Sequence, residues 1–99
     1  MRFVTLHIRY PNHGWLTVGD LAWRDSESEG RNGERLCREA DDRVTAASGQ
    51  PQAWLSVMVD GGDRLWLFYA ERTLADRLTV RTSNTTTRDH VIRVIRGEL

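Results

Sequence analysis

The sequence holds 99 residues, enough for one domain with a single hydrophobic core and too few for two. It is 39% hydrophobic and 28% charged, which is the balance of a globular chain and not of a disordered one. The 14 basic and 14 acidic residues give a formal net charge of zero, which argues against a dedicated nucleic-acid binder because such proteins carry excess positive charge.

The N-terminal stretch predicts no targeting segment. Arg2 and Arg9 interrupt it, so it lacks the apolar core of a signal peptide, and no apolar run in the chain is long enough to span a bilayer. The lone Cys37 excludes an internal disulfide and suits a reducing compartment. We therefore expect a soluble, cytoplasmic protein with no membrane partner.

The first third of the chain predicts two strands and a loop. Apolar and polar side chains alternate over residues 2–10, as in a strand with one solvated face. Residues 11–14 are predicted to form a turn in which Gly14 is available for positive φ, and residues 15–18 a second strand. The strand could continue through residue 23, or a short helix could start after Gly19, and both alternatives stay open. Residues 24–33 are polar throughout, so we expect a loop there.

A helix is predicted over residues 34–48. Asn32 can cap its start, and Gly49 can close its end. Cys37 lies one position from the apolar stripe, so we interpret it as a small buried residue and not as a reactive thiol. The stripe itself follows helical spacing at Leu36, Ala40, Val44 and Ala47.

Residues 53–70 predict a hairpin at the centre of the sheet. Gly61 and Gly62 suit a two-residue loop, which would place Val57 opposite Trp66. The hairpin is apolar on both faces, so both need a cover. We expect the helix on one face, and either the C-terminal segment or another molecule on the second. The faces are predicted as Trp54, Met58, Leu65, Leu67 and Tyr69 against Leu55, Val57, Val59, Trp66 and Phe68.

The last third of the chain predicts a further strand at 77–83, a turn at 84–87 and a terminal element at 88–96. The terminal element has the composition of a strand and the pattern of a helix, and we favour the helix. The predicted fold is therefore a single α+β domain over residues 1–99. It has an antiparallel sheet of about four to five strands, one main helix and a C-terminal helix.

No catalytic or metal-binding motif is visible. His7, His13 and His90 have no metal-site spacing, and the carboxylates of Asp60 and Asp63 are too few for a cation loop. We expect no catalytic residue, no metal and no cofactor.

Charge and tryptophan distribution indicate the candidate binding residues. Residues 20–63 hold five Arg and ten acidic residues, whereas residues 64–99 hold seven Arg and four acidic residues. Segregated charge steers association, and tryptophan anchors interfaces when it does not fill a core. For Trp15 and Trp23 the core and an interface remain equal alternatives. The predicted partner-binding residues are Trp15, Trp23, Glu34, Glu39, Asp41, Asp42, Arg88, Arg93 and Arg96.

These features favour a small, non-catalytic protein-binding module that inhibits or antagonises another macromolecule. Phage anti-defence proteins, anti-CRISPR proteins among them, and toxin-neutralising immunity proteins belong to this size class. One alternative is a nucleic-acid-binding regulator that uses Arg88, Arg93 and Arg96 as a basic strip. A second is a small enzyme or ligand-binding domain that works as a dimer, and a homodimer is open in every case.

Overall fold

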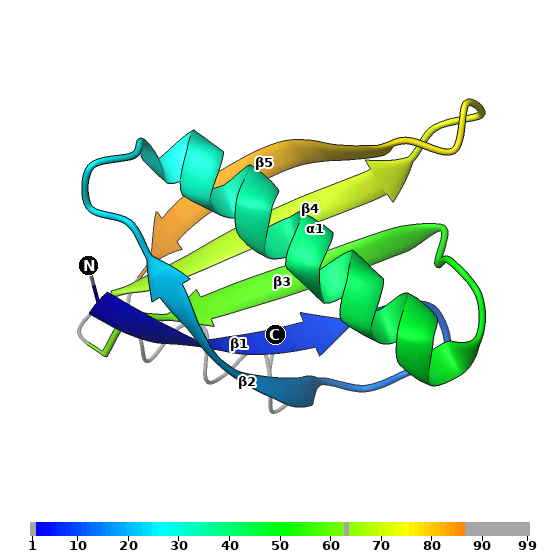
Figure 1. Cartoon of the computed structure of the whole chain (residues 1–99), viewed down its shortest axis with the longest axis horizontal. Helices are drawn as coiled ribbons and strands as arrows, with labels where there is room; N and C mark the ends of the chain where they lie inside the picture. The colour runs from blue at the N-terminus through cyan, green and yellow to red at the C-terminus, as the bar shows by residue number, and fades with distance from the viewer. Residues whose placement is uncertain (1, 63, 87–99) are drawn as a thin grey trace.

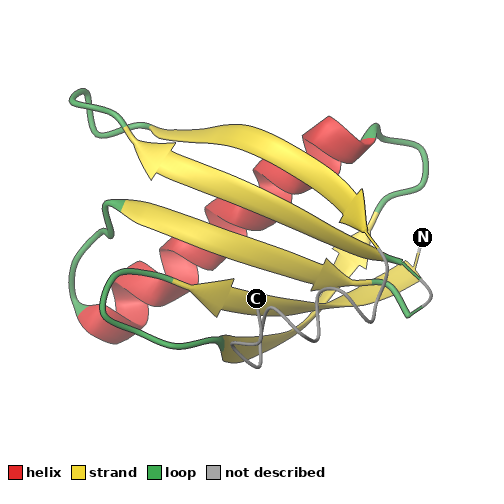
Figure 2. Cartoon of the chain, turned by 180° about the vertical axis from the view of Figure 1, so that it is seen from behind, coloured by secondary structure: helices red, strands yellow, loops and turns green. Residues whose placement is uncertain are grey.

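The computed structural model describes residues 2–62 and 64–86. They form one five-stranded antiparallel sheet with a single helix across one of its faces (Figure 1, Figure 2), which confirms the predicted α+β class. The strand order is β2-β1-β3-β4-β5, so the hairpin of β3 and β4 lies within the sheet as predicted. The predicted C-terminal helix at 88–96 lies outside the described residues. The elements are β1 (Arg2–Arg9), β2 (Leu16–Trp23), α1 (Glu29–Ser48), β3 (Trp54–Asp60), β4 (Leu65–Arg72) and β5 (Leu78–Thr86).

The main core lies between α1 and the sheet. The helix contributes the small and medium side chains Leu36, Cys37 and Ala40, which are almost fully buried. Small residues on this helix face let it approach the large aromatic rings of Trp66 and Phe68. The sheet side of the same core comprises Val4, Leu6, Ile8, Tyr10, Trp23, Leu55, Val57, Val59, Trp66, Phe68 and Ala70.

The opposite face of the sheet carries a second apolar cluster. Met58 and Leu65 are each 2% exposed, and the partly buried side chains of Trp15 and Leu67 pack against them. The strands therefore bury apolar residues on both sides, as the two-sided pattern of residues 53–70 predicts. This burial explains why the hairpin does not alternate between apolar and polar positions.

The start of the helix differs from the prediction. The helix begins at Glu29, within the predicted loop, and Ser28 is its N-cap, with Oγ accepting a hydrogen bond from the Arg31 N–H (3.2 Å). Asn32, the predicted cap, lies inside the first turns and is fully buried. The first turn was missed because its exposed polar residues give no apolar stripe. The C-terminal end is confirmed, because Gly49 closes the helix at φ 82°.

The predicted register of the central hairpin was wrong by two residues. Four residues, 61–64, separate the strands instead of two. Val57 therefore pairs with Phe68, and Val59 pairs with Trp66. Asp60 Oδ1 accepts a hydrogen bond from the Gly62 N–H (2.8 Å), which shapes this longer loop. A shift of two residues leaves every side chain on its predicted face, because the side-chain period of a strand is two.

Two predicted turns also need correction. In the turn after β1 the positive φ of 64° belongs to Asn12 and not to Gly14. Asparagine tolerates this left-handed conformation because its side chain can hydrogen-bond locally. The turn predicted at 84–87 does not begin there, since β5 continues to Thr86 and pairs with β4 along its length.

Candidate partner-binding groove

A groove of about 630 Å³ lies between α1 and the hairpin of β4 and β5. One wall is the exposed side of the helix, and the other is the end of β4 with the first residues of β5. Its lining is more polar than apolar and carries charges of both signs. The helix contributes Glu34, Arg38, Asp41 and Asp42, and the hairpin contributes Arg72, Asp76, Arg77, Leu78, Thr79 and Val80.

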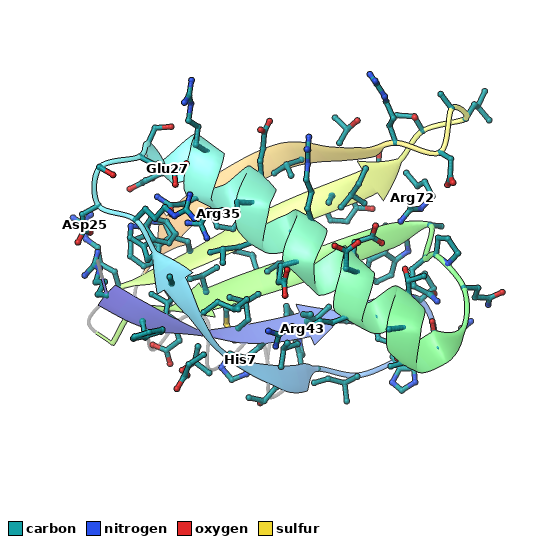
Figure 3. The ribbon with its side chains drawn as sticks, in the orientation of Figure 1. His7, Asp25, Glu27, Arg35, Arg43 and Arg72 are labelled. Carbon is teal, nitrogen blue, oxygen red and sulfur yellow. The ribbon has the colours of Figure 1, made fainter. Side chains whose placement is uncertain are left out.

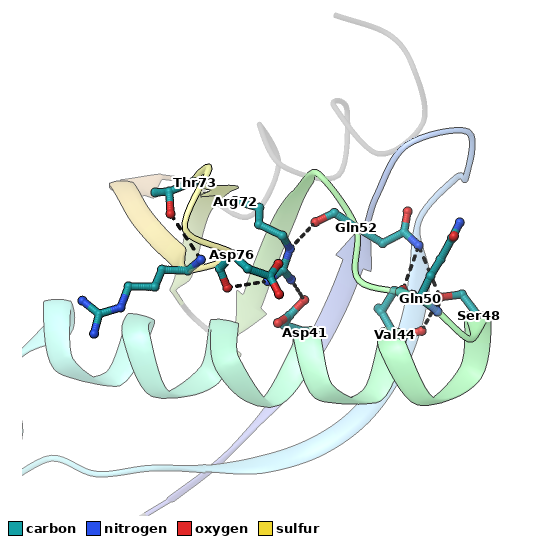
Figure 4. A network of polar contacts seen from close by, with 9 residues as sticks. Asp41, Val44, Ser48, Gln50, Gln52, Arg72, Thr73 and Asp76 are labelled. Carbon is teal, nitrogen blue, oxygen red and sulfur yellow. Dashed lines mark hydrogen bonds and ion pairs between the residues drawn. The ribbon is translucent and has the colours of Figure 1, made fainter.

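Arg72 joins the two walls of the groove. Its guanidinium donates to the carboxylate of Asp41 on α1, and its Nε donates to the carbonyl of Gln52 (2.9 Å). A third contact reaches Asp76 at the tip of the hairpin (3.4 Å) (Figure 4). The Arg72 and Asp41 side chains are only 14% and 16% exposed, so this ion pair forms largely away from water, where it holds geometry better than a surface pair does. The position of the helix relative to the hairpin is therefore fixed.

Four further charged side chains line the groove without such partners. Glu34, Arg38, Asp42 and Arg77 are all exposed, and none forms an ion pair with another described residue. Two are acidic and two are basic, so the unpaired charge of the groove sums to zero. Charges of both signs on rigid elements suit a partner surface that also carries both signs.

The hairpin tip beside the groove is an ordered turn. The Asp76 N–H donates to the carbonyl of Thr73 (2.9 Å), and the Thr73 N–H donates to the carbonyl of Arg77 (2.8 Å). Asp76 closes the turn at φ 61°. Leu74 projects from this turn and is fully exposed. A leucine held in water on a fixed turn is an apolar contact point two residues from the groove.

Asn32 secures the other end of α1. Its side-chain amide donates to the carbonyl of Arg24 (2.9 Å) and its Oδ1 accepts from the Arg24 N–H (2.9 Å). The same amide also reaches the carbonyls of Glu27 and Ser28 (3.3 and 3.1 Å), which ties the 24–28 loop to the helix. The guanidinium of Arg35 donates to Asn32 and to the carbonyl of Ala22 on β2 (2.9 Å). Polar contacts therefore anchor the helix to the sheet near its start, through Asn32 and Arg35, and at Asp41 in its middle.

The predicted acidic residues divide into three groups. Glu34 and Asp42 line the groove and have no ion-pair partner among residues 2–62 and 64–80. Asp41 lines it too, but its carboxylate is occupied by Arg72. Glu39 lies outside this groove, paired with Arg43 one turn further along (3.2 Å).

The other predicted residues lie elsewhere. Trp23 is 4% exposed and stacks on Trp66 with ring centroids 4.3 Å apart, so it fills the core, one of its two expected roles. Trp15 is partly buried in the second cluster. The predicted basic strip of Arg88, Arg93 and Arg96 lies outside the described residues.

Sequence reasoning missed the arginines of the groove. Arg38 was obscured by the acidic residues around it on the helix. Arg72 and Arg77 flank a turn that carries no motif, and Arg72 meets Asp41 across 31 positions of sequence. No pattern in the sequence marks these arginines, because their place in the groove depends on how α1 crosses the sheet.

The thiol of Cys37 and the rings of His7 and His13 occupy structural positions, and His90 lies outside the described residues. Burial, with a smaller contribution from the charge of Glu34, raises the pKa of Cys37 from 9.0 to about 12. The His7 ring lies 3.0 Å from the Thr17 hydroxyl, and the His13 ring stacks on Tyr10. Within residues 2–62 and 64–86, no three His, Cys, Asp or Glu side chains are grouped as a metal site would require.

No protein-family model matches the chain, and no curated protein or solved structure shows significant similarity to it. Within the described part of the chain, no helix combines the length and the apolar character that crossing a bilayer demands. The geometry of the groove is therefore the basis for a functional argument.

Proposed function

We propose that this protein is a small, non-catalytic protein-binding module that inhibits or antagonises another macromolecule, as phage anti-defence proteins and toxin-neutralising immunity proteins do. The observation that carries the proposal is the groove between α1 and the β4–β5 hairpin. There Glu34, Arg38, Asp42 and Arg77, which form no ion pair with one another or with other described residues, present charges of both signs. The exposed Leu74 adds an apolar contact at the rim.

The charge balance of the groove favours a protein partner over a nucleic acid. A phosphate backbone is bound by excess positive charge, and its affinity depends on the number of neutralised phosphates. Here every unpaired arginine is matched by an unpaired carboxylate, which would repel phosphate. A protein surface carries both signs, so it can complement Arg38 and Arg77 while also pairing with Glu34 and Asp42.

Affinity capture tests this proposal directly. The tagged protein is incubated with lysate of its own cells, with and without nuclease, and the retained macromolecules are identified. We expect one or a few proteins to be retained at stoichiometric amounts in both samples. Retention that disappears with nuclease would instead support the nucleic-acid alternative, in which Arg88, Arg93 and Arg96 bind the phosphates. No retained macromolecule, together with a small molecule that raises the Tm, would replace the proposal with a ligand-binding domain.

A further inference from the structure

The two edges of the sheet are treated differently by the rest of the chain. β2 and β5 are the outer strands of the sheet (Figure 2), and an outer strand carries backbone N–H and C=O groups without a neighbouring strand. Proteins cover such edges or use them to pair with another chain. The contrast between β2 and β5 therefore shows which edge is available.

The β2 edge is protected. Arg35 donates to the carbonyl of Ala22 (2.9 Å), and Arg43 donates to the carbonyl of Val18 (3.4 Å). Figure 3 shows both arginines on the side of α1 that faces β2, whereas Arg72 lies toward the hairpin of β4 and β5.

The first residues of β5 carry no such protection. Arg72 donates its backbone N–H to the residue that precedes β3 (2.9 Å), so its polar backbone groups face away from β5. The backbone N–H and C=O groups of the preceding residue, Glu71, then face β5, because successive residues of a strand direct these groups to opposite sides. Glu71 pairs with Thr79, so the backbone groups of Leu78 and Val80 face outward. In the described part of the chain, no side chain hydrogen-bonds to these outward groups.

The outward positions of β5 match an antiparallel copy of themselves. The register shift places Arg81 as an extra residue between Val80 and Thr82. Beyond it the outward residues are Ser83 and Thr85. An antiparallel second β5 therefore aligns Val80 with Ser83 of the second copy, and Leu78 with Thr85 of the second copy. Every outward group then meets another outward group, with the two bulges facing each other at the centre.

We propose that a second copy of this chain pairs with β5 in the antiparallel direction and extends the sheet across both molecules. The two-fold axis is then perpendicular to the sheet, so both α1 helices lie on the same face. The two grooves join into one trough between the helices. In each copy the acids Glu34 and Asp42 balance the arginines Arg38 and Arg77, so these four residues bring no net charge to the dimer. The protected β2 edges end the assembly at a closed dimer and not a fibre.

The pairing does not depend on the proposed function, although the trough enlarges the groove in which that function is placed. Sedimentation of the purified protein alone, from micromolar to millimolar concentration, tests it without any partner. We expect the mass to double with concentration. A mass of one chain over the whole range would overturn the dimer and would leave the capture experiment unaffected.

Two substitutions at Val80 separate backbone pairing from side-chain packing. Val80→Pro removes an N–H that faces outward and makes no bond within the sheet, so the fold is retained and the dimer is lost. Val80→Ala leaves a smaller side chain than Val80→Pro does but keeps the N–H. Its dimer dissociation constant should therefore lie within a few-fold of that of the natural chain. A dimer that survives Val80→Pro with unchanged affinity would contradict the assigned edge.

Amide hydrogen exchange gives the same answer without any variant. The Leu78 and Val80 amides should exchange at least tenfold more slowly at a concentration where the dimer forms than at a dilute one. The Thr79 amide, bonded within the sheet, should be slow at both. Equal exchange of Leu78 and Val80 at the two concentrations, in a sample that has doubled its mass, would place the interface elsewhere.

Discussion

Asp41 on α1 and Arg72 on β4 form an ion pair in which the two side chains keep only 16% and 14% of their exposure. They stand 31 residues apart in sequence, and their contact fixes one wall of the groove against the other. The pair matters because a largely buried charge that loses its partner is expensive. It therefore offers a sharp comparison with the free charge next to it on the helix.

Asp41→Asn is expected to lower the free energy of unfolding by about 2 kcal/mol, since Arg72 would lose its largely buried carboxylate partner and keep only that of Asp76, whose side chain is exposed. Asp42→Asn is the matched control. Asp42 is exposed and forms no ion pair within the described residues, so the same change should stay within about 0.5 kcal/mol. Urea denaturation of both variants checks the pair. Equal effects would show that the buried contact contributes nothing specific.

Gly33→Ala should destabilise the protein by about 1–3 kcal/mol, because an added Cβ would collide with the ring of Phe68 in the core. Gly30→Ala in the same helix meets no atom closer than 4.0 Å. That control should stabilise the helix by about 0.5–1 kcal/mol through propensity alone. Thermal unfolding should therefore move in opposite directions for the two variants, and a rise in Tm for Gly33→Ala would contradict the close packing of α1 on β4.

Asn32→Ala should cost about 2–3 kcal/mol, because several backbone groups of residues 24–28 and the Arg35 guanidinium lose a buried partner. The loss should be local as well as global. Hydrogen exchange should accelerate at Arg24, whose N–H donates to Asn32, while amides of β3 follow only the global change. Uniform acceleration across the chain would show that Asn32 does not hold this loop.

The Cys37 thiol makes stability depend on alkaline pH. Its pKa is about 12 in the folded chain against 9.0 ordinarily, so below pH 9 both states keep the proton and the thiol adds no pH dependence. Above pH 9 the unfolded chain releases the proton first, and stability falls by about 1.4 kcal/mol for each pH unit up to pH 12. Cys37→Ala should lack this slope. If the free energy of unfolding fell equally with pH for the two proteins between pH 9 and 11, the assigned burial of Cys37 would be contradicted.

The sequence predicts the sheet well where the apolar pattern is strong. The two faces of β3 and β4, the buried side of β1 and the buried position of Cys37 all follow from side-chain spacing alone. The error in the hairpin register came from a loop of four residues, in which the Asp60 side chain accepts from the Gly62 N–H and Gly62 takes φ 96°. Spacing could not reveal that hydrogen bond.

The candidate groove could be predicted only in part. Glu34 and Asp42 belong to an acidic helix that is visible in the sequence, but their exposure next to Arg77 depends on how α1 crosses the sheet. The start of α1 depends on Ser28 and on the folding of the Asn32 side chain back onto the loop. Both are contacts of polar side chains with nearby backbone groups, and hydrophobic periodicity carries no information about them.

The most direct test of the central claim, that the free charges of the groove bind a protein partner, is the association rate of the captured partner with charge-reversed variants. Asp42→Arg places the wrong sign in the groove, and Glu29→Arg makes the same charge change on α1 at an exposed position outside it. We expect the first to lower the association rate by about tenfold at low salt, with the difference shrinking as salt rises, and the second to change it by less than about twofold. Equal rates for the two variants would contradict the assignment of the groove as the binding surface.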